Sequence, residues 1–139
     1  MRQWKKKDQH PDLGDLLWLS QSGQISATHA IDSVNVNVDA NAGDHDGMTP
    51  LHWASHHGHL EVVKTLLGVA EVDVNKANDR GETPLLWASY HGHVEVVKAL
   101  LAAKAGVNEA PSRYETPLWW ALSHNHTEIV ALLRAAATE

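Results

Sequence analysis

The sequence predicts an all-α solenoid of four helix-turn-helix repeats with β-turn fingers. A motif of threonine, proline and leucine, followed by apolar residues, occurs three times and begins at Thr49, Thr83 and Thr116. These threonines lie 34 and 33 residues apart, which is the period of a two-helix unit that stacks on its neighbours. A glycine–histidine pair follows nine residues after the first two threonines, at Gly58-His59 and Gly92-His93. The function of such a chain lies in the surface that the stacked repeats share.

Each residue of the motif has its own physical role. Thr49 can accept a hydrogen bond from a free backbone N–H and cap the first helix. Pro50 suits the first helical position, because the N–H that proline lacks is not needed there. Ala54 is small where the two helices of a repeat approach closely. In the second helix, Val62-Val63 and Leu66-Leu67 form an apolar stripe that faces the neighbouring helices.

These motifs resemble the ankyrin repeat, and the resemblance covers most of the chain. The second helices begin with similar sequences after Gly58, Gly92 and Asn125, and aligning Gly23 with Gly58 adds a degenerate first repeat. A basic leader over residues 1–11 is expected to be disordered. The predicted ankyrin repeat domain covers residues 12–139, with repeats at about 12–45, 46–79, 80–112 and 113–139.

Three departures from the repeat pattern predict local differences. One extra residue after Gly68 lengthens the second helix of the second repeat or the loop behind it. Tyr114 stands in the last repeat where the two preceding repeats have the turn glycines Gly47 and Gly81, so we expect either strain or another turn there. Asn125 replaces the glycine between the last two helices and tolerates a left-handed conformation.

The resemblance implies a binding surface made of turn tips and first helices, the concave face of ankyrin stacks. Its variable positions flank the turn glycine and precede the Gly-His pair, and tyrosine and arginine are the natural anchors among them. Trp119, which replaces the motif histidine, is expected to be partly exposed. The predicted partner-binding residues are His45, Asp46, Met48, His56, His57, Asp79, Arg80, Glu82, Tyr90, His91, Ser112, Arg113, Glu115, Trp119, Ser123 and His124. They predict a non-catalytic protein–protein interaction module with a protein partner of unknown identity.

The chain has 11 histidines, and these leave an alternative function open. The resemblance implies that His59, His93 and His126, and likewise His52, form hydrogen bonds with neighbouring backbone groups. A metal site could combine His52 with His56, four residues apart on one helix face, and a third ligand from His59, His45 or Asp46. A pH response is favoured over metal, since histidine titrates near pH 6.5 and full protonation would add 11 charges to a formal −6. The alternative is therefore a histidine-dependent metal- or pH-responsive binding protein, and no metal site is assigned.

The tryptophans at one repeat position, Trp18, Trp53, Trp87 and Trp120, are predicted to form a ladder in the core, with ligand stacking as the other interpretation. The segment from Asp39 to Asp44 opens like a calcium loop. It lacks the glycine at position six and the closing glutamate at position twelve, so a repeat turn is the better interpretation. The resemblance also implies possible hydroxylation of the repeat-end asparagines Asn41, Asn75 and Asn108 by an asparaginyl hydroxylase.

Composition argues against several other functions. The chain lacks cysteine, which removes disulfides and thiolate metal sites, and its net charge of −6 argues against nucleic acid as partner. No apolar run reaches the roughly 18–20 residues of a membrane span. No phosphate-binding loop or nucleophile motif indicates an enzyme. We expect a cytoplasmic or nuclear monomer without cofactor, nucleic-acid partner or membrane partner. Whether the sequence is a whole protein or a piece of a larger one stays open.

Overall fold

A computed structural model describes residues 13–23, 40–69 and 71–138 of the chain. These residues form seven helices and no strand, which confirms the predicted all-α repeat fold. The helices are α1 (Leu13–Ser22), α3 (Pro50–His57), α4 (Leu60–Leu67), α5 (Pro84–His91), α6 (Val94–Ala102), α7 (Pro117–Ser123) and α8 (Thr127–Ala137). None of these described helices combines the length and the apolarity that crossing a membrane requires.

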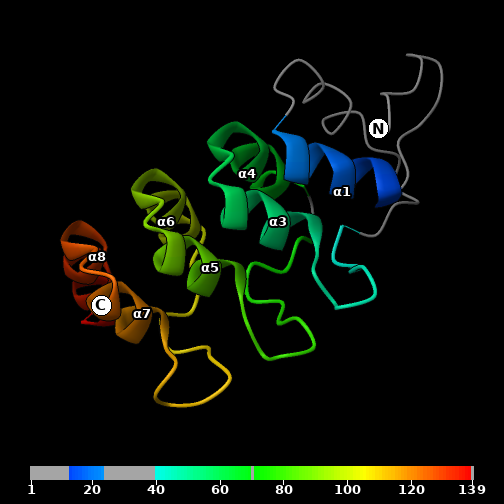
Figure 1. Ribbon diagram of the computed structural model, residues 1–139. Coiled ribbons are helices and arrows are strands. Elements are labelled where there is room, and N and C mark those ends of the chain that lie inside the picture. The colour runs from blue at the N-terminus through cyan, green and yellow to red at the C-terminus, as the bar shows by residue number, and fades with distance from the viewer. Residues whose placement is uncertain (1–12, 24–39, 70, 139) are drawn as a thin grey trace.

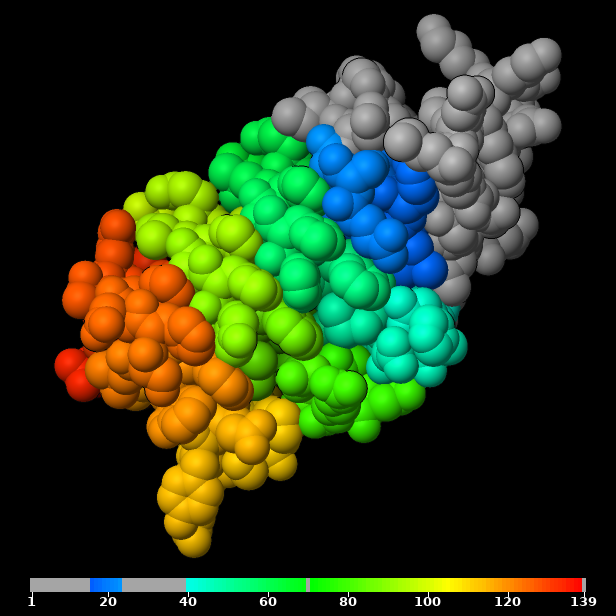
Figure 2. Space-filling model, in the orientation of Figure 1, coloured from blue at the N-terminus to red at the C-terminus, as the bar shows by residue number. Residues whose placement is uncertain are grey.

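The helices form two rows, as Figure 1 shows. The first helices α1, α3, α5 and α7 contact one another in sequence, and α4, α6 and α8 form the second row behind them. In the space-filling view of Figure 2, successive repeats lie as successive bands along the stack. Helix α1 packs on α3 and α4 as a first repeat should. Residues 24–39 of that repeat and the predicted leader lie outside the described residues, so the count of four repeats remains a prediction.

The threonines of the three motifs cap α3, α5 and α7 as predicted. Each hydroxyl oxygen accepts a hydrogen bond from the backbone N–H three residues later, at 3.3, 3.3 and 3.2 Å. Proline occupies the start of each helix. In α3 the cap is reciprocal, because the backbone N–H of Thr49 donates to Nδ1 of His52 at 3.1 Å. Leu86 and Trp119 take the place of His52 in the next repeats and have no nitrogen to accept this bond.

One hydrophobic core runs through the described repeats. Ala54 and Ala88 are completely buried where the helices meet, as their small size predicts. The stripe of α4 is also confirmed, since Val62, Val63 and Leu66 are buried. The core therefore passes from repeat to repeat between the two rows of helices.

The extra residue of the second repeat lies in a loop. Helix α4 ends at Leu67 and has 8 residues, whereas α6 has 9. The chain turns through a left-handed residue after each helix, at Glu71 (φ 67°) and at Lys104 (φ 69°). Of the two predicted places for the insertion, the structure thus selects the loop.

The last repeat resolves its two departures in different ways. Tyr114 is not among the positive-φ residues of the described chain, so this finger forms another turn instead of a strained one. Its turn is closed by Ser112, whose carbonyl oxygen accepts the N–H of Glu115 at 3.2 Å. Asn125 adopts a φ of 59°, which confirms the left-handed conformation predicted for it.

Candidate functional site

Five ring side chains form a continuous row across the first helices. We call Trp53, His56, Trp87, Tyr90 and Trp120 the aromatic row. Successive ring centroids along it lie 5.8, 4.8, 6.0 and 4.7 Å apart. All five residues are half-buried. The row thus offers one edge of packed rings to solvent along α3, α5 and α7.

The predicted core ladder of tryptophans is therefore wrong for Trp53, Trp87 and Trp120. In α3 and α5 the core direction is already taken by Leu51 and Leu85, which are 2% and 1% exposed. Successive helical residues point about 100° apart, so tryptophans two positions later face another way. The remaining member of the predicted ladder, Trp18, is half-buried and packs against the core.

Trp119 extends the aromatic row at its end. Its ring meets that of Trp120 edge-on at 4.7 Å, and 44% of the residue is exposed, as predicted. The residues at the same position in earlier repeats, His52 and Leu86, are 0% and 2% exposed. The next repeat covers them, and within the described residues no repeat follows Trp119.

A second set of rings flanks the row. His57 stacks on Trp53 at 6.0 Å and His91 on Trp87 at 5.8 Å. The equivalent His124 lies 5.8 Å from Trp120. All three histidines are exposed, and each imidazole packs on the tryptophan of its own repeat.

The other motif histidines join adjacent repeats. Each donates from Nε2 to a backbone carbonyl oxygen of a neighbouring repeat, which confirms the expected structural role. The bonds are His59 to Gln21 (3.1 Å), His93 to His56 (3.0 Å), His126 to Tyr90 (3.1 Å) and His52 to Glu82 (2.8 Å).

Histidine protonation is disfavoured in the aromatic row. Burial, followed by the nearby histidines His91 and His57, lowers the pKa of His56 to about 4. Burial is also the main cause that lowers the pKa of His57, His91 and His52. His56 therefore stays neutral near pH 7. The expectation that the chain gains 11 positive charges close to pH 6.5 is therefore too large.

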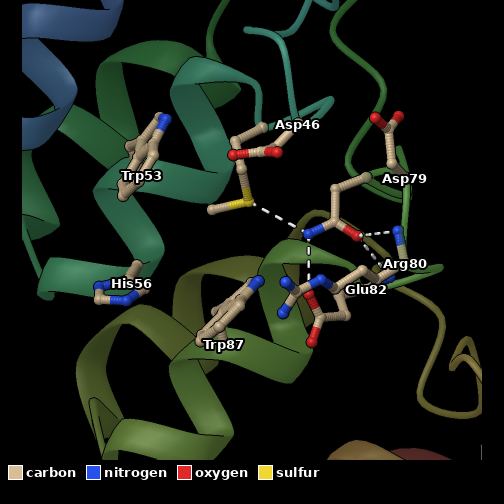
Figure 3. A pocket seen from close by; sticks show the side chains of 9 residues that line it. Asp46, Trp53, His56, Asp79, Arg80, Glu82 and Trp87 are labelled. Atoms are coloured by element: carbon tan, nitrogen blue, oxygen red, sulfur yellow. Dashed lines mark hydrogen bonds between the residues drawn. The ribbon is translucent and has the colours of Figure 1, made fainter.

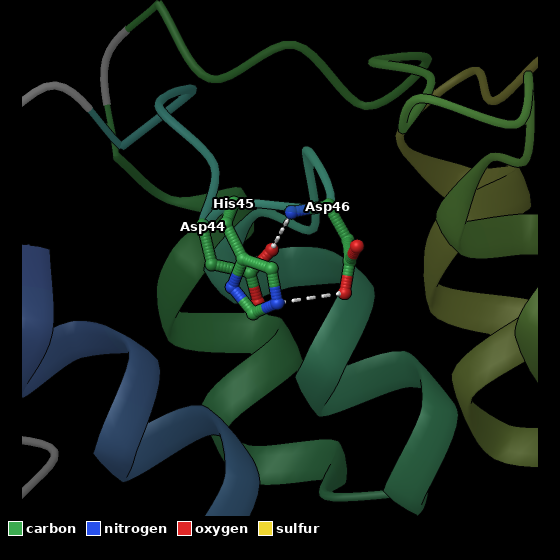
Figure 4. Close-up of side chains that lie close together, drawn as sticks. All are labelled: Asp44, His45 and Asp46. Carbon is green, nitrogen blue, oxygen red and sulfur yellow. Dashed lines mark hydrogen bonds and ion pairs between the residues drawn. The ribbon is translucent and has the colours of Figure 1, made fainter.

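Three potential metal ligands meet in the first described finger. Asp44, His45 and Asp46 each offer an atom within 4.8 Å of the others (Figure 4). Both carboxylate oxygens of Asp44 already accept bonds, Oδ1 from the N–H of Asp46 at 2.9 Å and Oδ2 from Nε1 of Trp53 at 3.0 Å. Burial raises the pKa of Asp44, but these bonds outweigh it and the net pKa is lowered. The hydrogen bonds within the finger therefore account for the position and the lowered pKa of the Asp44 carboxylate.

The predicted His52–His56 pair does not form a metal site either. Nε2 of His52 donates to the carbonyl of Glu82, which leaves Nδ1 as the acceptor for Thr49. Both ring nitrogens of His52 are therefore in use. We assign no metal site to the described residues.

A pocket of about 180 Å³ lies between α3, α5 and their fingers (Figure 3). It is lined by Asp46, Met48, Trp53, His56, Asn78, Asp79, Arg80, Glu82 and Trp87. Six of these were predicted partner-binding residues. Sequence reasoning missed Asn78 and assigned the two tryptophans to the core. Met48 is only 5% exposed, so it lies at the base of the pocket and is not an open contact.

The predicted residues of the last repeat are exposed but lie outside this pocket. Arg113 places its guanidinium carbon 5.1 Å from the ring centroid of Tyr114. The remaining exposed residues of the predicted face are His45, Ser112, Glu115 and Ser123. The predicted face thus has a compact part around the pocket and a separate part at the last finger.

The repeat-end asparagines serve the loops. Oδ1 of Asn75 accepts the N–H of Gly106 at 2.8 Å, and Oδ1 of Asn41 accepts the N–H of Asp73 at 2.6 Å. Asn108 is exposed. Hydroxylation remains a proposal for all three, which a +16 Da species in the mass spectrum of the native protein would support.

Comparison with known proteins agrees with this architecture. The family model described as ankyrin repeats (3 copies) matches residues 16–110 and 69–138. The chain therefore belongs to the ankyrin-repeat family. None of the curated proteins searched matches it. Ankyrin repeats are generally protein–protein interaction modules, and the family is typically non-catalytic.

Proposed function

We propose that this chain is a non-catalytic binding module that holds a protein partner on its fingers and first helices, the predicted concave face. The aromatic row carries this proposal. Partly exposed aromatic side chains gathered in one stripe are typical of interaction surfaces, and tyrosine and tryptophan are enriched among the residues that dominate binding energy.

The chemistry of the face supports a protein partner. Its rings are held by neighbouring rings and by the repeat scaffold, so binding would cost little side-chain entropy. Around the rings, the fingers supply polar groups such as Asp46, Arg80 and Arg113, which can form the polar rim of an interface.

A pull-down from the lysate of the source organism, with bound proteins identified by mass spectrometry, tests this proposal. The binding variant is Tyr90→Ala with Trp119→Ala. A matched control, Lys64→Ala with Glu95→Ala, changes two exposed residues of the second helices. Circular dichroism verifies that all forms fold.

The candidate partner is then purified and its Kd measured by calorimetry. We expect the binding variant to weaken Kd at least about tenfold, the loss of one strong hot-spot contact, and the control to leave it unchanged. A partner that binds all three forms equally would refute the proposed face.

We further propose a monomer with four repeats, located in the cytoplasm or nucleus. Sedimentation equilibrium tests the monomer, and a fluorescent fusion in the source cell tests the location. Deleting residues 1–11 should leave the free energy of unfolding unchanged if they precede the folded domain.

A further inference from the structure

We propose that the pocket between α3 and α5 receives a lysine or arginine side chain of the protein partner, whose backbone carbonyl also accepts the indole N–H of Trp87. This inference rests on the proposed function, because it assumes a protein partner on the finger face. It adds the chemistry of the residue at the centre of that interface.

Charge in the pocket favours a cation. Three carboxylates line it, those of Asp46, Asp79 and Glu82. Arg80 is the only lysine or arginine in the lining, and His56 is neutral near pH 7 because burial lowers its pKa. The lining therefore carries a formal charge of −2. A positively charged side chain would be attracted, and a carboxylate repelled.

Two indole rings form the walls. Trp53 projects from α3 and Trp87 from α5, and Figure 3 shows both rings bordering the same space. Ring faces carry negative electrostatic potential and attract ammonium or guanidinium groups, and tryptophan does so most strongly. The long apolar stem of lysine or arginine also suits aromatic walls.

Two buried nitrogen atoms at the pocket have no hydrogen-bond partner within the protein, Nε1 of Trp87 and Nδ1 of His56. An indole N–H can only donate, so Trp87 requires an acceptor. A peptide carbonyl meets this need. Nδ1 of neutral His56 can accept a hydrogen bond from a cationic N–H if its other nitrogen carries the ring hydrogen.

The preceding repeat shows why Trp87 lacks a partner. There, Nε1 of Trp53 donates to the carboxylate of Asp44 at 3.0 Å. Asn78 takes the place of Asp44 one repeat later, so one carboxylate oxygen is replaced by an NH₂ donor. Its Nδ2 donates to Oε1 of Glu82 at 2.9 Å, and its Oδ1 accepts backbone N–H groups of the finger. This substitution leaves the N–H of Trp87 without an acceptor in the protein.

Arg80 lets the proposal predict the direction in which a charge substitution changes the binding affinity. As a positive charge in the lining, it would repel an incoming lysine or arginine and attract an acidic side chain. Removing Arg80 should therefore strengthen binding of a basic residue, and neutralising Glu82 should weaken it. If Arg80 were the anchor for an acidic partner, both effects would have the opposite sign.

The test uses four blocked pentapeptides with lysine, arginine, glutamate or norleucine between pairs of glycines. Each is titrated against the full ¹⁵N-labelled chain, and the indole N–H resonance of Trp87 is followed after assignment with Trp87→Phe. We expect saturable shifts with the lysine or arginine peptide and none with glutamate or norleucine. The tighter of the two basic peptides identifies the preferred side chain. No shift up to about 50 mM of either would overturn the proposal.

Matched variants show whether the pocket is responsible. Glu82→Gln keeps an oxygen for Asn78 and should weaken binding of the basic peptide about two- to fivefold, the effect of one partly exposed charge pair. Arg80→Gln should strengthen it by a similar factor. The control variants Glu115→Gln and Arg113→Gln lie at the same repeat positions in the last finger and should leave Kd unchanged. Equal Kd values in all variants would overturn the proposal that this pocket binds the basic side chain.

The two proposals fail in different ways. If the purified protein partner binds through Tyr90 and Trp119 but is insensitive to Glu82→Gln and Arg80→Gln, the pocket proposal is wrong and the proposed function stands. If the basic peptides bind as expected but no protein partner depends on Tyr90 and Trp119, the proposed face is wrong.

Discussion

Gly58 lies directly against the imidazole of His93 in the next repeat. A Cβ atom added to Gly58 would stand 2.6 Å from Nδ1 of His93, closer than side chains tolerate. The backbone at Gly58 also has a φ of 72°, which glycine adopts without strain. The same relationship joins two further pairs, Gly23 with His59 and Gly92 with His126. Of the adjacent glycine and histidine in each pair, the glycine therefore contacts the following repeat and the histidine contacts the preceding one.

This contact predicts an unusually costly alanine substitution at Gly58. The positive φ alone should lower the free energy of unfolding by about 1–2 kcal/mol. Displacement of His93 adds to this, since the imidazole also bonds the carbonyl of His56 at 3.0 Å. Asn125→Ala is the matched control, because it shares the positive φ and no later histidine faces it among the described residues. Urea denaturation should show a larger loss for Gly58→Ala.

A double variant separates the two causes. In a His93→Ala background, Gly58→Ala should cost only the conformational part, so the two substitutions should not be additive. Additive losses would show that the close approach of Gly58 and His93 is unimportant.

Sequence periodicity was sufficient to predict the fold and the helix caps, and the resemblance to ankyrin repeats predicted the role of the motif histidines. These features repeat because each repeat meets the same neighbours. The period could not show that Gly58 contacts His93, since their contact crosses between repeats. Nor could it show which helix face each tryptophan occupies, because the tryptophans recur at the same interval whether their side chains point toward the core or away from it.

The candidate site was predictable in part. Positions flanking the turn glycine led to Asp46, Arg80 and Glu82, which do line one pocket. The role of Asn78 was missed, because it depends on the hydrogen bonds of a single finger. Only the comparison of Trp87 with Trp53 in three dimensions reveals the indole N–H without an acceptor.

Trp53 and Trp87 should respond differently to the same substitution. Trp53→Phe removes a bond to the carboxylate of Asp44, and bonds to charged groups contribute about 1.5–3 kcal/mol. Trp87→Phe removes an N–H that has no partner in the protein. Both lose similar ring area, so the difference between them isolates the hydrogen bond. We expect urea denaturation to show the greater loss for Trp53→Phe, and equal losses would contradict this assignment.

Trp119 and Leu86 occupy one repeat position in different surroundings. Leu86 is 2% exposed, so Leu86→Ala should cost about 2–5 kcal/mol of unfolding free energy. Trp119 is 44% exposed, and Trp119→Ala should cost about 1 kcal/mol or less. Thermal and urea unfolding of both variants test this. A large loss for Trp119→Ala would mean that its ring supports the fold and would weaken its use as a binding probe.

Stability should fall as the pH falls from about 6.5 toward 4. An unfolded histidine binds its proton near pH 6.5, whereas burial and neighbouring histidines lower the pKa of folded His56 to about 4. Between these values the unfolded chain holds more protons, so acid favours unfolding. The lowered pKa values of His57, His91 and His52 act in the same direction.

The free energy of unfolding measured by urea at several pH values between 7 and 4.5 tests this prediction. His56→Gln should remove part of the slope, about 1–2 kcal/mol over the range once partial exposure is allowed for. Trp87→Phe alters the ring beside His56 without removing a titrating group, and it serves as the control. If His56→Gln leaves the slope as steep as in the original chain, His56 is not the group that resists protonation.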